Sequence, residues 1–203
     1  MNDNNVVFHK GHVSRKNRNM LNSHRSGLVW LTGLSGAGKS TIAHKVEEML
    51  FQGGVRCYVL DGDNVRHGIN SNLGFSREDR KENLRRVTEV SKIMIDAGIL
   101  CLAAFISPYR EDRENIRGCF EDGEFIEVFV NAPMDLCERR DPKGLYAKAK
   151  AGQIKEFTGI SAPYEAPEKP EIELRTDRLS VAESVTTILE YLNVLDTSGA
   201  VMI

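Results

Sequence analysis

The chain alternates short apolar runs with segments whose apolar residues recur at helical spacing. The runs at 27–32, 55–60, 99–106 and 125–130 are mostly apolar, as is typical of strands buried on both faces of a sheet. A shorter run at 171–174 can supply a last strand. Because the predicted strands alternate with helices, we expect an α/β fold, a five-stranded parallel sheet with helices on both faces.

Five other segments are predicted to be helical: 40–52, the segment between Ser76 and Gly98, 133–140, 145–151 and 181–195. The first has apolar residues at helical spacing and ends at two glycines. The second and longest begins with a capping box, in which Ser76 is followed three residues later by Asp79. Its expected buried stripe comprises Leu84, Val87, Val90, Ser91 and Met94.

The composition divides the chain into an arm, a domain and a lid. Residues 1–25 are polar and are expected to form an irregular arm. Residues 26–196 are expected to form one domain. Within it, the segment 141–170 is rich in Pro, Lys and Glu, which is typical of a lid that closes over a site.

Overall charge and cysteine content exclude several classes of protein. The net charge is -2, with 41% hydrophobic and 28% charged residues, so no general affinity for nucleic acid or membranes is expected. The N-terminal residues lack an apolar signal core, and no run has the ~20 apolar residues of a membrane helix. Four scattered cysteines without a CxxC pair favour a cytoplasmic location, and the five histidines do not suggest a metal cluster.

The strongest chemical signal is a glycine-rich loop between the first strand and the first helix. It reads Gly33, Leu34, Ser35, Gly36, Ala37, Gly38, Lys39, Ser40 and Thr41. This pattern predicts a P-loop NTPase fold, in which backbone N–H groups and the helix N-terminus bind phosphates. Lys39 is then expected to reach the β- and γ-phosphates of ATP, and the Ser40 hydroxyl to bind Mg²⁺.

A second signal follows the second predicted strand. Asp61, Asp63 and Arg66 lie at its carboxyl end, where open α/β sheets bind ligands. Beside a P-loop, the two carboxylates are candidates for the magnesium shell or for accepting a proton from an attacking hydroxyl. A capped turn with solvated acids is the alternative.

The long helix carries a third, weaker signal. Arg80 and Asn83 lie on its apolar stripe, so this stripe becomes polar near the start of the helix. The pair would suit a cleft, where Arg80 could pair with an anion and Asn83 could donate a hydrogen bond to it. A helix end that emerges into solvent explains the pattern equally well.

Three further candidates lie after the third strand and in the lid. Ser107 follows a strand and could bind substrate, cap a helix or act as a nucleophile. Arg140 could stack on an adenine or touch a phosphate. Lys143 belongs to a basic segment that could close over phosphates and exclude water.

Taken together, the motifs resemble one family, the adenylyl-sulfate kinases. The resemblance covers about residues 4–195 and rests on these pieces: GLSGAGKST at 33–41, LDGDNVRHGIN at 60–70, LGFSREDRKENLRRV at 73–87, AFISPYREDR at 104–113, RDPKGLYAKAKAGQIKEFTGI at 140–160 and YEAPEKPEI at 164–172. The P-loop alone indicates only an NTPase, whereas the other pieces together are specific.

The resemblance implies an activity and a set of roles. Members of the family transfer a phosphoryl group from MgATP to the 3′-hydroxyl of adenosine 5′-phosphosulfate (APS) in sulfate assimilation, and the resemblance implies a homodimer. Asp63 would lie near the substrate hydroxyl, and Ser107 corresponds to a serine described as a phosphoserine intermediate. The implied APS-binding residues are Arg66, Phe75, Arg80, Asn83, Ile106, Lys143 and Phe157.

Three alternatives would share the P-loop. Another small-molecule kinase, for gluconate or a nucleoside monophosphate, would not need Arg66, Arg80 and Asn83 together. A GTPase would carry an Asn-Lys-x-Asp motif, which the sequence lacks. A non-catalytic regulatory module would bind ATP without phosphorylating APS.

Overall fold

A computed structural model describes residues 7–141 and 143–194 and confirms the α/β prediction. The strands are β1 (Gly27–Thr32), β2 (Cys57–Asp61), β3 (Leu100–Ala104), β4 (Phe125–Asn131) and β5 (Ile172–Arg175). They form one sheet in the order β2-β3-β1-β4-β5, and every neighbouring pair is parallel. All carboxyl ends of the strands therefore lie at the same edge.

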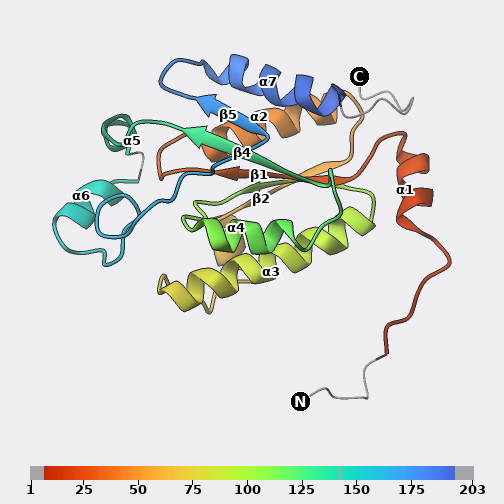
Figure 1. Ribbon diagram of the computed structural model, residues 1–203, viewed down its shortest axis with the longest axis horizontal. Helices are drawn as coiled ribbons and strands as arrows, with labels where there is room; N and C mark the ends of the chain where they lie inside the picture. Colours follow the sequence, from red (N-terminus) through yellow and green to blue (C-terminus); the bar gives the residue numbers. More distant parts are fainter. Residues whose placement is uncertain (1–6, 142, 195–203) are drawn as a thin grey trace.

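Helices cover both faces of this sheet (Figure 1). The helices are α1 (Arg15–Asn22), α2 (Lys39–Gln52), α3 (Arg77–Asp96), α4 (Arg110–Arg117), α5 (Met134–Arg140), α6 (Leu145–Lys150) and α7 (Val181–Val194), with a 3₁₀ turn η1 (Asn64–His67). α2 and α7 lie on one face, and α3 and α4 lie on the other (Figure 1). Predicted and observed ends of strands and helices differ by at most two residues.

The central strand β1 contributes to the hydrophobic core on both faces of the sheet, and all six of its residues are buried. Val29 and Leu31 pack with α2 and α7 on one face. Trp30 points to the other face, where its ring lies 5.4 Å from that of Phe105 and 6.2 Å from that of Phe125. Burial on both faces explains why this run shows no polar alternation.

The prediction of an irregular N-terminal arm is wrong for α1, and residues 1–6 lie outside the described part. Ser14 caps this helix and forms a capping box with Asn17, a pairing that the usual Glu or Gln pattern does not reveal. Arg15 then donates to the Ser26 hydroxyl at 2.7 Å and pairs with Glu124. The helix is thus fixed beside the amino end of β1 (Figure 1).

Helix α4 was not predicted from the sequence. Its buried residues are Asp112, Arg113 and Ile116, so two of three inward positions are polar and the apolar periodicity is absent. The helix nevertheless packs beside α3 (Figure 1). Its Arg113 makes internal contacts that replace apolar burial.

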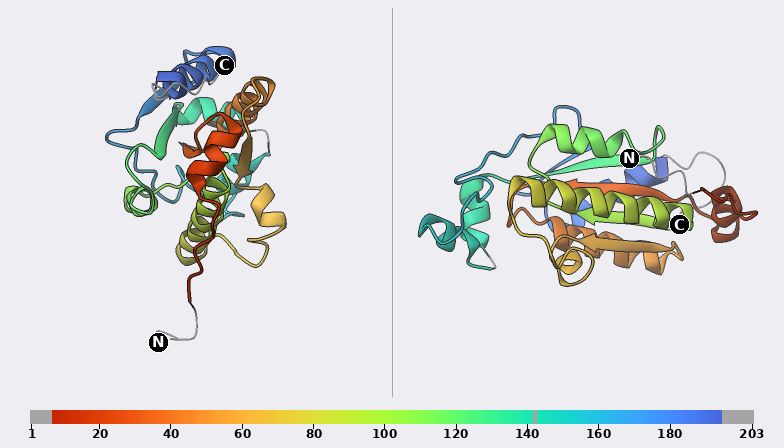
Figure 2. Two further views of the ribbon diagram at one scale, coloured as in Figure 1. Left: turned by 90° about the vertical axis from the view of Figure 1, so that its right-hand side faces the viewer. Right: turned by 90° about the horizontal axis from the view of Figure 1, so that it is seen from below.

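The predicted lid contains α6 and lies with α5 at the carboxyl edge of the sheet (Figure 2). Asp141 fixes the start of α6 by accepting from the backbone N–H groups of Leu145 at 2.8 Å and Tyr146 at 3.0 Å. The Tyr146 hydroxyl donates to the backbone oxygen of Ser35 at 2.9 Å. The lid is therefore joined directly to the glycine-rich loop. Residue 142 and the predicted domain end, 195–196, lie outside the described residues.

No helix among residues 7–141 and 143–194 combines the length and apolar character needed to cross a membrane.

Candidate active site

A cleft of about 1450 Å³ lies where the strands end at the carboxyl edge. It is lined by the P-loop from Ser35 to Thr41, the end of β2, the start of α3, the loop after β3 and the lid. Every predicted site residue lines this cleft except Gly33 and Leu34. Segments predicted separately from the sequence therefore form one site.

The P-loop needs glycine because its backbone passes close to neighbouring backbone. Gly36 has φ +77°, and a Cβ there would lie 2.7 Å from the backbone oxygen of Cys137. Gly33 also has a positive φ and lies against the backbone oxygen of Val130. Side chains at either position would meet backbone atoms that cannot move away. Leu34 packs against the core on the α2 face.

Lys39 is held inside the P-loop at the start of α2. Its ammonium group donates to the backbone oxygens of Gly33 at 2.9 Å and Leu34 at 2.8 Å. Desolvation by burial lowers the pKa of Lys39 to about 8, although nearby Asp61 opposes this shift. The site therefore holds a costly buried cation, which phosphate oxygens would stabilise.

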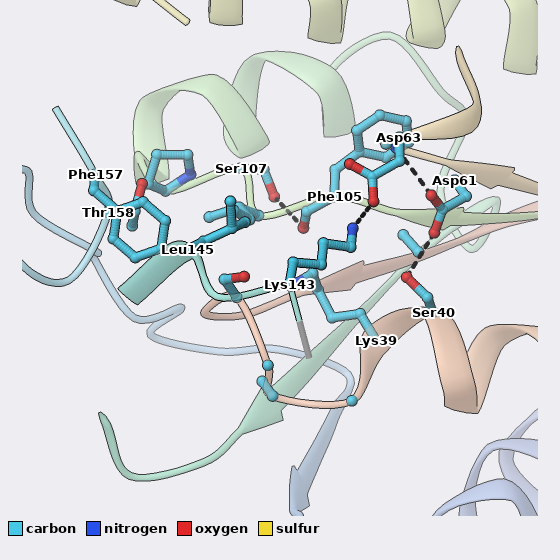
Figure 3. Close-up of a pocket in the computed structure, with 18 of the residues that line it drawn as sticks. Lys39, Ser40, Asp61, Asp63, Phe105, Ser107, Lys143, Leu145, Phe157 and Thr158 are labelled. Atoms are coloured by element: carbon cyan, nitrogen blue, oxygen red, sulfur yellow. Dashed lines mark hydrogen bonds and ion pairs between the residues drawn. The ribbon is translucent and has the colours of Figure 1, made fainter. Parts of the chain in front are cut away.

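Ser40 and Asp61 form an oxygen-rich contact beside Lys39 (Figure 3). The Ser40 hydroxyl donates to Asp61 Oδ2 at 2.6 Å, and Asp61 Oδ1 accepts from the backbone N–H of Asp63 at 2.9 Å. Hydroxyl and carboxylate oxygens suit Mg²⁺, which in phosphate sites takes few protein ligands and several waters. Across the described residues, no cluster of three or more His, Cys, Asp or Glu could hold a metal by itself.

Asp63 forms an ion pair with Lys143 (Figure 3). Asp63 follows β2, whereas Lys143 lies at the start of the lid, 80 residues later. Both side chains are more than half exposed, so the pair contributes little to stability. It joins the lid to the carboxyl edge of the sheet within the cleft.

Two arginines and an aromatic ring form the opposite side of the cleft. The guanidinium of Arg66 lies 4.4 Å from the centre of the Phe75 ring, and that of Arg80 lies 5.9 Å from it. Arg80 also donates to the backbone oxygen of Glu156 in the lid at 3.0 Å. Burial lowers the pKa of both arginines, and Arg80 lowers the pKa of Arg66 further by repulsion. Such a pair of cations is suited to an anion.

Asn83 lies one helical turn after Arg80 in α3. It is 5% exposed and lines the cleft. Its side-chain oxygen accepts from Asn70 Nδ2 at 2.9 Å. Of the two interpretations of the helical pattern, a polar pair in a cleft and a helix end in solvent, the structure favours the first, because the polar start of α3 faces the cleft.

Ser107 has its hydroxyl occupied by structural contacts. Its Oγ accepts from Trp30 Nε1 at 3.0 Å and donates to Thr32 Oγ1 at 3.0 Å. The residue is 3% exposed and has φ +38°, so the chain turns sharply after β3. Among the described residues, no histidine or carboxylate is hydrogen bonded to this hydroxyl.

Ile106 and Phe157 supply apolar lining to the cleft. Phe157 is 7% exposed and packs edge-on against Tyr146, with ring centres 4.9 Å apart. Thr158 follows it, and its hydroxyl is buried without a partner in the described structure. Figure 3 shows both residues on the lid side of the cleft.

Hydrogen bonds link Arg140 and the P-loop to Thr176, a residue that the sequence did not identify. Arg140 donates to the backbone oxygen of Thr176 at 2.8 Å and lies near the backbone oxygens of Gly36 and Ala37. The Thr176 hydroxyl donates to Ala37 O at 2.9 Å. Thr176 comes directly after β5 and carries no motif, so only the proximity of β5 to the P-loop identifies it.

Comparisons with known proteins support a single family. The family model described as adenylylsulphate kinase matches residues 25–175. An adenylyl-sulfate kinase from Staphylococcus haemolyticus is 58% identical over 188 residues, which cover 93% of this chain and 94% of that protein. One from Geotalea uraniireducens is 54% identical over 195 residues, covering 96% and 94%.

Solved structures agree with these relatives. The APS kinase of Mycobacterium tuberculosis, in complex with AMPPNP and APS, has a TM-score of 0.79 and 50% identity, covering 83% of this chain and 98% of that one. A gluconokinase from Sinorhizobium meliloti has a TM-score of 0.54 at 18% identity, covering 84% and 93%. The second similarity concerns the fold alone.

Proposed function

The chain belongs to the adenylyl-sulfate kinase family, and from this membership we propose how its cleft transfers the γ-phosphoryl group of ATP to the 3′-hydroxyl of APS. The products are ADP and 3′-phosphoadenylyl sulfate. The observation that supports the proposal is that one cleft has cationic side chains on two sides, each suited to a phosphate group. One is the P-loop with Lys39, and the other is the Arg66–Arg80 pair beside Phe75.

The P-loop half would bind ATP. Backbone N–H groups at the start of α2 and the Lys39 ammonium group would contact the β- and γ-phosphates. Arg140 lies near the same loop and would contact the nucleotide from the lid side. Since Lys39 already lies within the loop, little movement is needed to transfer its contacts from backbone oxygens to phosphates.

The Ser40–Asp61 contact fits a magnesium ion. The two oxygens lie 2.6 Å apart, and both are hard ligands. When bound with ATP, Mg²⁺ would neutralise part of the phosphate charge. Ser40 would bind it directly, and Asp61 would bind it or a water in its shell.

The second half would bind APS. Phe75 and Phe157 would contact its adenine, with Ile106 completing the apolar lining, while Arg66 and Arg80 would hold the phosphosulfate. Asp63 would orient the 3′-hydroxyl and accept its proton. In the present structure Asp63 pairs with Lys143, so this ammonium group would be near the transferred charge as well. These roles fit phosphoryl transfer by positioning and charge neutralisation.

We propose direct transfer, in which Ser107 positions the loop after β3. Its hydroxyl is already hydrogen bonded to Trp30 and Thr32, and no side chain that could act as a base is hydrogen bonded to it in the described part of the chain. Incubation with γ-labelled ATP in the absence of APS should therefore leave no stable label on the protein. Stoichiometric phosphorylation of Ser107, with ping-pong kinetics, would contradict direct transfer and support the intermediate that the family resemblance implies.

A coupled assay for ADP release with and without APS tests the function. ADP should form rapidly only when ATP, Mg²⁺ and APS are all present, and gluconate or nucleoside monophosphates should not replace APS. ADP release that does not depend on APS would overturn the assignment. ATP binding without any turnover would instead indicate a regulatory module. The homodimer and the cytoplasmic location stay predictions.

Affinity for ATP should decrease above about pH 8. Burial lowers the pKa of Lys39 to about 8 in the free protein, so its ammonium group loses its proton as the pH rises through this value. Because bound phosphates favour the protonated form, the Kd for ATP should rise by up to about tenfold per pH unit above 8. Calorimetric titration with a non-hydrolysable ATP analogue between pH 7 and 9.5 measures this. Lys39→Met should abolish the rise, and an equal rise in that variant would exclude Lys39 as its origin.

A further inference from the structure

Asn70 is a fully buried polar residue next to the half of the cleft that is proposed to bind APS. It is 0% exposed, and its Nδ2 donates to the side-chain oxygen of Asn83 at 2.9 Å. Its own side-chain oxygen is buried without a partner. The side chain of Asn70 therefore makes one hydrogen bond among the described residues, and that bond is to a residue lining the cleft.

The bond determines which group Asn83 presents to the cleft. Its Oδ1 is occupied by Asn70, whereas its Nδ2 has no hydrogen-bond partner anywhere in the described ranges 7–141 and 143–194. Because Asn83 lines the cleft, its NH₂ group is available to a ligand. The amide is thus arranged as a donor toward the site.

The reverse orientation of the two side-chain amides would have a higher free energy. If both amides were flipped, Asn83 Nδ2 would donate to Asn70 Oδ1, and the NH₂ group of Asn70 would take the buried place that now holds its unpartnered oxygen. Buried donors without acceptors are rarer and costlier than buried carbonyls without donors. The surroundings of Asn70 therefore favour the donor orientation of Asn83.

Other contacts hold the loop that carries Asn70. Its backbone N–H donates to Val65 O at 2.9 Å, and its backbone oxygen accepts from Leu73 at 3.1 Å. Arg86 donates to Ile69 O at 2.9 Å, in the same loop. These contacts involve main-chain atoms or other residues, so a substitution of the Asn70 side chain leaves them in place.

We propose that Asn70 is a positioning residue for the acceptor substrate. It fixes the Asn83 amide so that the NH₂ group, one turn from Arg80, donates to an oxygen or nitrogen acceptor of the nucleotide. This inference rests on the proposed function, because it assigns Asn83 to the APS half of the cleft. The residue acts through Asn83 and touches no substrate itself.

A double-mutant cycle with Asn70→Ala, Asn83→Ala and both changes together tests the proposal. Loss of one oriented hydrogen bond should raise the KM for APS about tenfold in each single variant. The double variant should match Asn83→Ala within about twofold, because Asn70 acts only through Asn83. The KM for ATP should stay within about twofold of the wild-type value, since the P-loop is not affected.

Asn70→Asp separates orientation from packing because it keeps the size of the side chain. Above the pKa of the introduced carboxyl, that group can only accept, so Asn83 should turn its NH₂ away from the cleft and the KM for APS should rise. At lower pH the protonated carboxyl can donate to Asn83, so the KM should return toward the wild-type value. A pH-independent KM equal to that of the wild type would overturn the proposal.

Asn72→Ala serves as the matched control in the same loop. Asn72 is exposed, and its side-chain oxygen accepts from Arg86 at 2.7 Å rather than bonding to Asn83. It should change neither KM. The role of Asn70 would be overturned if the rise in the KM for APS in the double variant were the product of the rises in the two single variants. It would also be overturned if Asn70→Ala raised the KM for ATP as much as the KM for APS. Absence of APS-dependent turnover in the wild type would instead reject the function itself.

Discussion

Lys39→Met is expected to lower kcat by two to three powers of ten while the protein stays folded. Lys39 is the cation of the P-loop, and charge develops on the transferred phosphoryl group in the transition state. Removing one preorganised donor of this kind typically costs about 2.7–4 kcal/mol. In the coupled assay at saturating ATP and APS, the loss should therefore be mainly in kcat.

The matched control is Lys45→Met on the same helix. Lys45 is about half exposed and pairs with Glu48 at 2.7 Å, so its removal should change kcat by less than twofold. Lys39→Met should stay folded, because the substitution removes the free-energy cost of burying a cation. The backbone oxygens of Gly33 and Leu34, which lose their donor, can accept hydrogen bonds from water in the cleft instead. Turnover by Lys39→Met within tenfold of the wild type would contradict its assignment to the phosphates.

Arg113→Met is expected to destabilise the fold by about 3–5 kcal/mol, as does the loss of one partner from a buried ion pair. Arg113 in α4 is 3% exposed. Its guanidinium donates to Glu127 in β4 at 2.7 Å, to Ser107 O at 2.6 Å and to Glu165 O at 2.7 Å. One side chain thus joins the sheet, the loop after β3 and the end of the lid. Urea denaturation at neutral pH measures the loss.

Two further variants show whether the buried charge is the cause. Arg110→Met removes an exposed arginine of the same helix that pairs with Glu168, and it should cost less than about 1 kcal/mol. Adding Glu127→Gln to Arg113→Met removes the uncompensated carboxylate and should recover part of the lost stability. If Arg113→Met costs no more than Arg110→Met, the contacts of Arg113 do not hold these segments together.

The local patterns of the sequence predicted the strands and most of the helices. A run such as 27–32 is mostly apolar because β1 is covered on both faces. Burial on both faces can therefore be predicted directly from the residue types. Helix α3 was predicted from its cap, and Ser76 does accept from the backbone N–H of Asp79 at 3.1 Å. The second bond of a capping box differs, because the Asp79 carboxylate accepts from the Ser76 hydroxyl at 3.0 Å rather than from its backbone N–H. Helices α1 and α4 were missed because Asn17 completes an unusual capping box and Arg113 occupies a buried position.

The P-loop was predictable in detail because a strand, a turn and a helix start adjoin in sequence. The roles proposed for its glycines, Lys39 and Ser40 depend mainly on backbone geometry within a few residues. The acidic end of β2 was predictable for a similar reason, since carboxyl ends of parallel strands share one edge. The particular acceptor substrate came from the resemblance of several motifs to a family, which the comparisons bear out.

The sequence by itself therefore determined the strands, the P-loop and the family. The strands and the P-loop depend on residues that are close together in the chain, and the family depends on several such local motifs taken together. Only the tertiary structure decided which distant side chains meet. Asp63 and Lys143 are 80 residues apart, and Arg80 and the backbone oxygen of Glu156 are 76 apart. Likewise, Asn70 reaches Asn83 because a loop folds back onto α3. Such contacts form between elements that the fold brings together, and no local pattern of residue types records them.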